Sequence, residues 1–415
     1  MRHTLPALAL IACLALSAVG QQIHVVDAAS GPGSDYSDLQ TALDAAASGD
    51  VLLMRAGSYS GASVTGKAVS VVADDDASVQ IDGRLRIVGT PIGSTTSIKG
   101  LNITSPVGTQ QPALQTKTCH GTLWVESCTL TGGAAVSNGG PAPGASVEGC
   151  NDAVFVRCVI TGGSVGNNNG SGREGLFADD SDIWMFESDL VGANSNSSGS
   201  GSVGFSGASA AWIQDTALFA TASAFKGGWG GDAEEDGNSG CGSAGDGGSG
   251  VRALNSTFTQ QACTFAPGSS GFPVDPECGP GDPGQDVALF GSSSTRVLPG
   301  ATRGLRMSAV VREGELAQFA AFGAAGELVW WIAGFDASSL DLPGKNSPLL
   351  LQLPILLSLP MANLPAGGVL IVDFPAPELP VGFDGVILRN QAFFAGTGNG
   401  QLSNAASTLF LDASL

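Results

Sequence analysis

The segment FADDSD holds the residues best suited to acid–base chemistry in this chain of 415 residues. Asp179, Asp180 and Asp182 stand almost side by side there. Two carboxyl groups can cleave a glycosidic bond, because one donates a proton while the other acts as base or nucleophile. A solvated turn between two strands is the favoured interpretation. An acidic and a basic group converging in a groove beside this segment would instead favour catalysis.

The Gly- and Asp-rich insert 227–250 offers hard oxygen ligands of the kind that Ca²⁺ prefers. The candidates are Asp232, Glu234, Glu235 and Asp236, with Asp246 beyond them. No EF-hand or nonapeptide spacing accompanies them, so a flexible acidic loop is favoured and calcium has weak support. Apart from calcium, no cofactor is expected. His24 and His120 are the only histidines after residue 20, and Cys-x-x-Cys is absent, which argues against zinc.

A repeated pattern must position any such groups. GTLWVESCTLTGG at 121–133 returns as NDAVFVRCVITGG at 151–163, with further copies from Ser181, Thr216 and Ser249 and a looser one from Ser94. The third, fifth, eighth and tenth positions are apolar or small in every close copy. The third position holds Leu123, Ala153, Ile183, Leu218 and Val251, and the eighth holds Cys128, Cys158, Ser188, Ser223 and Ser256.

This alternation sends all four positions to one core, with one change of phase between the fifth and the eighth. The eighth positions, at 101, 128, 158, 188, 223 and 256, are 27 to 35 residues apart. Such a period indicates a solenoid, and each copy is too short to hold a long helix beside its strands. We therefore predict a parallel β-solenoid with coils about 4.8 Å apart. The glycine-rich inserts between copies should leave it at one corner.

The outward fourth position forms an apolar stripe along the coils. It holds Trp124, Val154, Trp184, Phe219 and Arg252. Exposed aromatic rings can stack on neutral sugars, so Trp124, Trp184 and Phe219 are candidate ligand-binding residues. The stripe can equally be the surface on which the C-terminal part of the chain docks. Docking is favoured, because the neighbouring sixth position adds aliphatic side chains.

The N-terminus reads as a cleaved secretory signal over residues 1–20, with an apolar run from Leu5 to Leu16. A lipoprotein anchor at Cys13 is the disfavoured alternative. No later segment is predicted to cross a membrane. The chain after residue 20 has 16 basic and 37 acidic residues, which argues against nucleic acid and anionic membranes as partners.

The cysteines suit an oxidising compartment. Cys119 with Cys150, and Cys263 with Cys278, are candidate disulfides. Cys128 and Cys158 should stand one above the other inside the coils, where reduced, buried thiols are at least as plausible.

A short helix should precede the coils. Ser37 and Gln40 form a capping box, Leu39 and Leu43 share one face, and Gly49 is the stop. The pattern DLQTALDAA followed by GDVLLMRAGSYSG resembles the opening of right-handed parallel β-helix proteins of the pectin-lyase-like superfamily, over about residues 23–261. The resemblance implies an N-terminal capping helix. It implies no single activity, because lyases, hydrolases, esterases, adhesins and phage spikes share the fold. His120 lies in Cys-His-Gly, and the Arg-x-Lys of the family's hydrolases is absent.

The composition and the hydrophobic pattern of the sequence change in its last third. Apolar runs such as ELVWWIAGF and GGVLIVDF, at roughly ten-residue spacing, predict an antiparallel β-sandwich. The predicted organisation is a signal at 1–20, a β-helix domain at 21–265, a Pro/Gly-rich linker at 266–285 and a sandwich domain at 286–415. This order resembles bacterial secreted β-helix proteins that end in a sandwich module.

The chain is therefore predicted to be an all-β, secreted or cell-surface protein. The favoured function is a non-catalytic structural or carbohydrate-contacting module, with a polysaccharide or a cell-surface component as partner and a monomeric state. The alternative is a polysaccharide lyase or glycoside hydrolase with its carboxylates on the β-helix.

Overall fold

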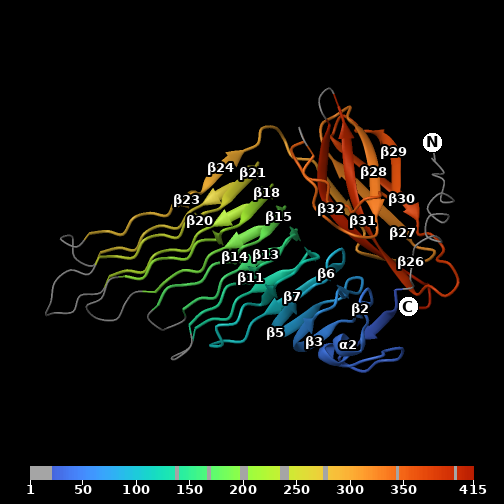
Figure 1. The fold of residues 1–415 in the computed structure, drawn as a ribbon, viewed down its shortest axis with the longest axis horizontal. Coiled ribbons are helices and arrows are strands. Elements are labelled where there is room, and N and C mark those ends of the chain that lie inside the picture. The colour runs from blue at the N-terminus through green and yellow to red at the C-terminus, as the bar shows by residue number, and fades with distance from the viewer. Residues whose placement is uncertain are drawn as a thin grey trace.

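The computed structural model describes residues 21–135, 140–165, 170–196, 204–233, 243–273, 279–342, 345–396 and 400–415. A parallel β-solenoid carries long arms on one side and a second β unit on the other (Figure 1). One side of the solenoid is a ten-stranded sheet in the order β1 (Ile23–Val26), β2 (Val51–Met54), β4 (Ser70–Ala73), β6 (Thr95–Lys99), β9 (Thr122–Glu126), β12 (Ala153–Val156), β15 (Asp182–Phe186), β18 (Ala217–Thr221), β21 (Thr257–Gln261) and β24 (Ser294–Val297).

A fourteen-stranded sheet forms the remaining sides and turns back at β5 (Val79–Val88). One limb holds β7 (Leu101–Thr104), β10 (Thr129–Thr131), β13 (Val159–Thr161), β16 (Asp189–Val191), β19 (Ala224–Lys226) and β22 (Thr264–Ala266). The other holds β8 (Leu114–Lys117), β11 (Ala145–Glu148), β14 (Leu176–Asp179), β17 (Ala211–Gln214), β20 (Val251–Leu254) and β23 (Val287–Phe290), and β3 (Gly57–Thr65) pairs with β5. The predicted parallel β-helix is confirmed.

The repeat sets the register of the coils. Leu123, Ala153, Ile183 and Leu218 pair directly on successive strands of the ten-stranded sheet, and all four are buried. The predicted change of phase is a single left-handed residue between this sheet and the next strand, such as Ser127 with φ 53°. A corner of this kind turns the chain without breaking the inward pattern.

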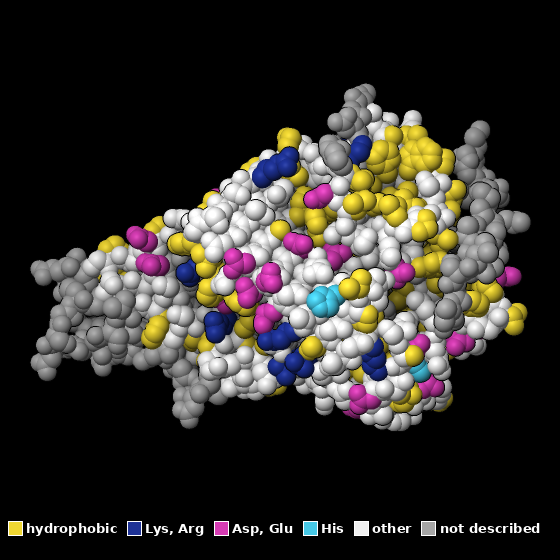
Figure 2. Space-filling view, viewed as in Figure 1, with side chains coloured by type: hydrophobic (Ala, Val, Ile, Leu, Met, Phe, Trp, Pro, Cys, Tyr) yellow, Lys and Arg dark blue, Asp and Glu magenta, His cyan; other side chains and the backbone are white. Residues whose placement is uncertain are grey.

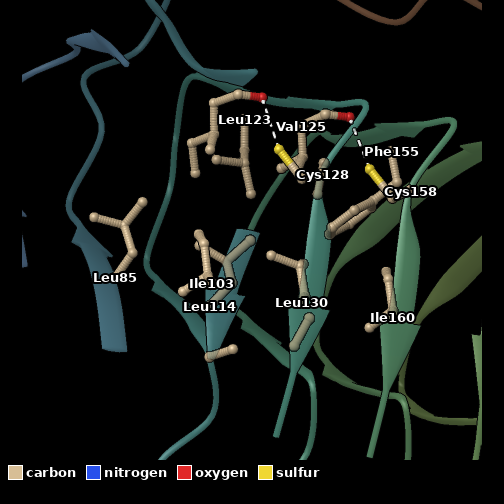
Figure 3. Packing of buried hydrophobic residues seen from close by; sticks show 14 of the residues in the cluster. Leu85, Ile103, Leu114, Leu123, Val125, Cys128, Leu130, Phe155, Cys158 and Ile160 are labelled. Carbon is tan, nitrogen blue, oxygen red and sulfur yellow. Dashed lines mark hydrogen bonds between the residues drawn. The ribbon is translucent and has the colours of Figure 1, made fainter. Parts of the chain in front are cut away.

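The inner ladder of the coils contains the two thiols as the sequence predicts. Cys128 and Cys158 are buried and free, and each donates to a backbone carbonyl of the preceding coil, at 3.6 Å to Ile98 and 3.4 Å to Val125 (Figure 3). Burial raises the pKa of Cys128 to about 12, so its thiol stays protonated. Cys119 and Cys150 are also free thiols on adjacent coils, which differs from the suggested disulfide.

The last predicted copy is wrong by one strand. Val251 pairs with Ala211 of β17, whereas Phe258 is the residue that stacks on Leu218. The eighth position of this coil is therefore Cys263 and not Ser256, because Phe265, two residues further, pairs with Phe225. The long insert before this coil shifted the match with the repeat by one strand. Because β20 and β21 show the same alternation of inward and outward residues, the pattern alone could not tell which strand is equivalent to the earlier copies.

The helix α2 (Leu39–Ala45) covers the first coil, with Leu39, Ala42 and Leu43 buried. Its N-cap differs from the prediction: Asp38, not Ser37, accepts the hydrogen bond from the Thr41 amide at 2.8 Å. Gln40 instead bonds to the backbone of Ser63 on β3, so it ties the helix to the solenoid.

Five glycine-rich arms leave the solenoid between the two limbs of the large sheet. Their described residues are 132–135 and 140–144, 162–165 and 170–175, 192–196 and 204–210, 227–233 and 243–250, and 267–273 and 279–286, and in each arm the first range leaves the sheet and the second returns to it (Figure 1). The outgoing segments of successive arms form one layer and the returning segments form another. Within a layer, neighbouring segments are hydrogen-bonded; for example, the Gly230 amide donates to the Ser269 carbonyl at 2.9 Å. Outgoing and returning layers also bond together, as from the Gly248 amide to the Gly228 carbonyl at 2.8 Å. The prediction that the inserts leave at one corner is confirmed.

The arms repeat every three residues, which is the period of the polyproline II helix. Gly227 donates within its layer, Gly228 donates to the opposite layer, and the Trp229 amide donates to the Asn194 side chain at 2.8 Å. The glycines are required by close approach: a Cβ on Gly228 would lie 1.9 Å from the Ala193 carbonyl oxygen. Backbone hydrogen bonds therefore hold the arms together without a core of side chains.

The solenoid extends further along the chain than the sequence indicates. The last arm takes up most of the segment 266–285 that is predicted to be a linker. Residues 287–290 and 294–297, predicted to open the sandwich, pair in parallel with β20 and β21 and complete another coil. The division of the chain into a β-helix domain and a sandwich domain stays a prediction.

The C-terminal unit packs two sheets, as expected for a sandwich. One contains β25 (Gly304–Met307), β27 (Leu316–Phe322) and β30 (Val369–Pro375). The other contains β26 (Val310–Arg312), β32 (Gln401–Leu411), β31 (Gly385–Ala395), β28 (Leu328–Gly334) and β29 (Leu357–Asn363). Phe319, Trp331 and Phe394 lie in the core between the two sheets.

The outer face of the ten-stranded sheet is covered by this sandwich. Trp124, Val154 and Phe186 are fully buried and pack in one cluster with Leu350 and Ala405. The predicted docking of the C-terminal unit on the outward stripe is thus confirmed for these coils. The first coils dock through a second apolar cluster that includes Val51, Leu53, Val72, Ile387 and Leu409.

Between these two clusters lies a buried charge network. Glu126 accepts hydrogen bonds from the Trp124 indole at 3.1 Å, the Ser407 amide at 2.9 Å and Arg157 at 2.5 Å, and Lys99 lies 3.4 Å away. Burial works against the charged form, but Lys99 and Arg157 outweigh it and lower the pKa of Glu126 to about 2. The network joins both units, since Lys99 also donates to the Ser407 carbonyl.

Candidate functional site

A cleft of about 440 Å³ opens where the sandwich stops covering the solenoid. Its solenoid wall comes from β15, β18, β21 and β24, and its opposite wall from residues 341–342 and 345–348 of the sandwich. The volume falls in the range of small-molecule sites. The polar residues around it are Asp182, Thr257, Thr259, Arg296, Asp341, Lys345, Asn346 and Ser347.

Two aromatic rings line the solenoid wall of the cleft. Trp184 and Phe219 occupy the outward position of adjacent coils, and their ring centroids are 5.6 Å apart. Both side chains are half-buried, unlike Trp124 further down the same stripe. Two polar atoms of the lining, the Trp184 indole nitrogen and the Ser347 hydroxyl, are buried without a partner among the described residues. The wall combines an apolar surface with unsatisfied hydrogen-bonding groups.

Charges of both signs face one another across the cleft. Asp182 comes from β15 and Asp341 from the sandwich, while Arg296 and Lys345 supply the positive charge. Burial, followed by the negative charges of Asp180 and Asp341, raises the pKa of Asp182. Asn346 holds the sandwich wall to the end of the solenoid, because its amide donates to the Pro299 carbonyl at 3.0 Å.

The three carboxylates of FADDSD are not brought together. Asp182 lies in the cleft, whereas Asp179 ends β14 in the other sheet, between Glu148 and Gln214. Asp180 forms the corner between the two strands, with φ 46°. Burial, then Asp215, Asp180 and Glu148, raises the pKa of Asp179. Figure 2 shows Asp and Glu side chains gathered over β11 and β14. Asp179 and Asp182 therefore lie on strands of different sheets, and a catalytic role for the three carboxylates stays a prediction.

The predicted aromatic platform is divided in the same way. Trp124 is inaccessible beneath the sandwich, which corrects its proposed contact with a ligand. Arg252 lies on β20 in the other sheet, and Thr259 takes its expected place beside Phe219. Trp184 and Phe219 remain accessible because the sandwich wall stands away from the last coils.

The calcium candidates have another role where they are described. Asp232 accepts the amide hydrogen of Phe272 at 2.7 Å, and Asp246 accepts that of Asp282 at 2.8 Å, so both join neighbouring arms. Glu234, Glu235 and Asp236 lie outside the described residues. Within the described ranges, no three acidic, His or Cys side chains are grouped closely enough to hold a metal ion.

Sequence reasoning missed the groups that complete the cleft. Arg296 pairs with Thr259 on the last coil, so continuing the repeat by one more copy would have found it. Asp341, Lys345 and Asn346 lie in a segment with no repeat and no motif. Their place depends on docking of the sandwich.

The comparisons with known proteins are sparse. No family model and no curated protein matches the chain, whereas seven chains of solved structures match it. One is tailspike protein 2 of Escherichia coli O157:H7 bacteriophage CAB120, with 8% identity and a TM-score of 0.24, over 95% of this chain and 64% of that one. Another, Geobacillus virus E2 ORF18, has 10% identity and a TM-score of 0.28, over 83% of this chain and 75% of that one.

The chain thus spans 64% of the length of the tailspike. The finer resemblance to the pectin-lyase-like superfamily stays a prediction. In the part of the chain that the structure describes, no helix has the length and apolar character needed to cross a membrane.

Proposed function

We propose that this chain is a secreted or cell-surface β-helix protein that contacts carbohydrate, without cleaving it, in the cleft between the solenoid and the sandwich. The observation that carries the proposal is the pair Trp184 and Phe219, two half-buried rings on one wall of a polar-rimmed cleft. Sugar rings present apolar C–H faces and a periphery of hydroxyls. The rings fit the faces, and Asp182, Asp341 and Asn346 are suited to the hydroxyls.

The mixed charge of the cleft favours a neutral sugar. Two carboxylates and two cations surround the rings, so no single sign dominates at the site. The net charge of the whole chain is −20, which opposes the approach of acidic polymers. A neutral oligosaccharide avoids this repulsion.

The test is a binding screen of the purified chain against neutral and acidic polysaccharides, followed by titration of oligosaccharides from any hit. Trp184→Ala and Phe219→Ala should each weaken binding about fivefold or more, because stacking of rings contributes about 1 kcal/mol. Trp229→Ala is the matched control, since Trp229 is an exposed Trp on an arm, outside the cleft. Equal losses in all three variants, or no neutral hit, would reject the proposal.

Glycoside hydrolysis is the second candidate. Acidic and basic groups do converge in a groove beside FADDSD, and the raised pKa of Asp182 next to Asp341 suits a proton donor. Release of reducing ends from a polysaccharide that binds, lost in Asp182→Asn while binding persists, would establish this function. Binding without any product would support the non-catalytic proposal.

A further inference from the structure

A second hollow lies at the other end of the solenoid. It has a volume of about 330 Å³ and is lined by helix α2, the strands β3 and β5 and the segment 106–111. Two arginines of β5, Arg84 and Arg86, reach it. They stand two residues apart on one strand and are both half-buried on its outer side.

These two cations have no acidic partner. Among the described residues, no carboxylate oxygen lies within 4 Å of either guanidinium, so neither arginine forms an ion pair there. Arg84 donates to one neutral partner, the Gln115 side-chain oxygen at 2.8 Å, and the Arg86 side chain makes no hydrogen bond with any described residue. In a chain with 37 acidic and 17 basic residues, adjacent cations left without a carboxylate stand out.

The two positive charges also act on one another. Burial, followed by the positive charge of Arg86, lowers the pKa of Arg84. Gly61 on β3 and Gly83 on β5 let these two strands approach each other closely here, since a Cβ on Gly61 would lie 2.7 Å from the Arg84 amide nitrogen. Figure 2 shows Lys and Arg side chains gathered near the strand that Figure 1 labels β5. A bound anion would relieve the repulsion and use the free guanidinium donors.

We infer that Arg84 and Arg86 form a binding site for a single oxyanion group, a carboxylate, phosphate or sulfate, on a small polar ligand. A guanidinium binds each of these groups through two parallel hydrogen bonds. Gln111 and Ser63 border the hollow and offer neutral hydrogen-bonding groups to the rest of the ligand. A long polyanion is disfavoured, because the net charge of −20 repels it. The site is distinct from the cleft and does not depend on the proposed carbohydrate contact.

The test is calorimetric titration of the full chain with sodium sulfate, sodium phosphate and sodium acetate, with ionic strength held constant by sodium chloride. At least one oxyanion should show saturable binding. Arg84→Gln and Arg86→Gln should each weaken it at least about tenfold, the loss expected for a charge-assisted hydrogen bond. Arg86→Lys, which keeps the charge but loses the planar fork, should fall between them and the parent protein. Preference for acetate or for the tetrahedral anions identifies the group that the natural ligand carries.

Arg252→Gln is the matched control. Arg252 lies further along the same outward row of the large sheet, which runs through Arg86, Gln115, Ser146, Phe177 and Trp212. Its guanidinium lies over the Trp212 ring, 5.0 Å from the centroid, and it does not line the hollow. Its replacement should leave oxyanion binding unchanged. Absence of saturable binding to the parent protein, or equal affinity in Arg84→Gln and Arg86→Gln variants that retain the parent circular dichroism, would overturn the inference.

Discussion

The solenoid and its arms are built from one continuous chain, yet they are held together by different forces. In the coils, apolar side chains such as Leu123, Leu130 and Ile160 fill a continuous interior, and the backbone lies outside it (Figure 3). In the arms, the two backbone layers bond directly to each other, and the buried side chains are small, as at Ala142, Ala193 and Ala244. The coils should tolerate substitutions that keep the size of an inward side chain. The arms should tolerate almost nothing larger than the hydrogen of glycine where their two layers touch.

The coils also make use of the outer side of their wall. Trp124 and Phe186 are buried beneath the sandwich, and Glu126 joins the two units through charges. In the coils, side-chain packing thus stabilises both the interior of the solenoid and its contact with the sandwich. The arms have no comparable cover among their described residues, and Trp229 and Phe272 are exposed there at 59% and 77%.

Leu130→Asp should produce the largest effect. The side chain is fully buried at the tenth position of its coil, so a carboxylate would enter a narrow apolar interior. We expect a loss of at least about 4 kcal/mol in the free energy of unfolding, or failure to fold. Thr129→Asp is the control on the same strand, because Thr129 is exposed. Denaturant unfolding measures both, and similar stability of the two variants would contradict the inward pattern.

Glu126→Gln should come next and should depend on pH. The substitution leaves the buried Lys99 and the half-buried Arg157 without their counter-charge, so we expect a loss of about 3 kcal/mol near neutral pH. The pKa of Glu126 is lowered from 4.5 to about 2 on folding, so its stabilisation is complete above about pH 4.5 and is lost as the pH falls towards 2.

The difference in unfolding free energy between the parent protein and Glu126→Gln should therefore shrink between pH 4.5 and 2. Chemical denaturation at several pH values measures it. Glu148→Gln is a suitable control, because its ion pair with Lys117 lies at the surface with both partners about one third exposed. A pH-independent difference would contradict the buried charge.

Gly228→Ala tests the arms. The added Cβ would meet the Ala193 carbonyl oxygen at 1.9 Å, so the two layers must separate locally. We expect a cost of about 1–3 kcal/mol, expressed as faster hydrogen exchange of amides in the arms while the coils keep their protection. Gly279→Ala is the matched control, because its Cβ would have no neighbour within 4 Å. Equal exchange in the two variants would show that the layers are not in close contact.

Asp232→Ala should have the smallest effect. The Asp232 carboxylate accepts the Phe272 amide at the exposed side of the arms, so its loss should cost about 1 kcal/mol or less. Faster exchange of the Phe272 amide is the expected readout. Asp232→Asn keeps an acceptor oxygen and should retain most of the protection. Calcium binding that disappears in both variants would instead restore the metal-site hypothesis.

Much of the fold could be predicted from local patterns. Leu123, Ala153, Ile183 and Leu218 stack as their equivalent positions indicate, because the two-residue alternation of a strand is written directly in the sequence. Burial of Cys128 and Cys158 follows from the same alternation. The apolar runs of the last third similarly indicate the sandwich strands, although they do not show that β23 and β24 belong to the solenoid.

The candidate site could be predicted only in part. Trp184 and Phe219 were identified because they belong to the repeat, and Asp182 because it belongs to the acidic segment FADDSD, whereas Asp341 and Lys345 were not identified. Asp179 was grouped with Asp182 by closeness in sequence, but a left-handed corner at Asp180 sends them into different sheets. A turn of one residue is enough to separate neighbours, and side-chain types do not reveal it.

By itself, the sequence determined the solenoid, its inward residues and the presence of a second β unit, because these depend on contacts that recur with a short, regular spacing. Only the tertiary structure decided which part of the aromatic stripe is covered, how the arms assemble, and which charges meet in the cleft. Trp124 and Trp184 occupy equivalent places in the repeat, and they differ because the sandwich lies on one and stands away from the other. Such differences arise from contacts between distant segments, and no local pattern encodes them.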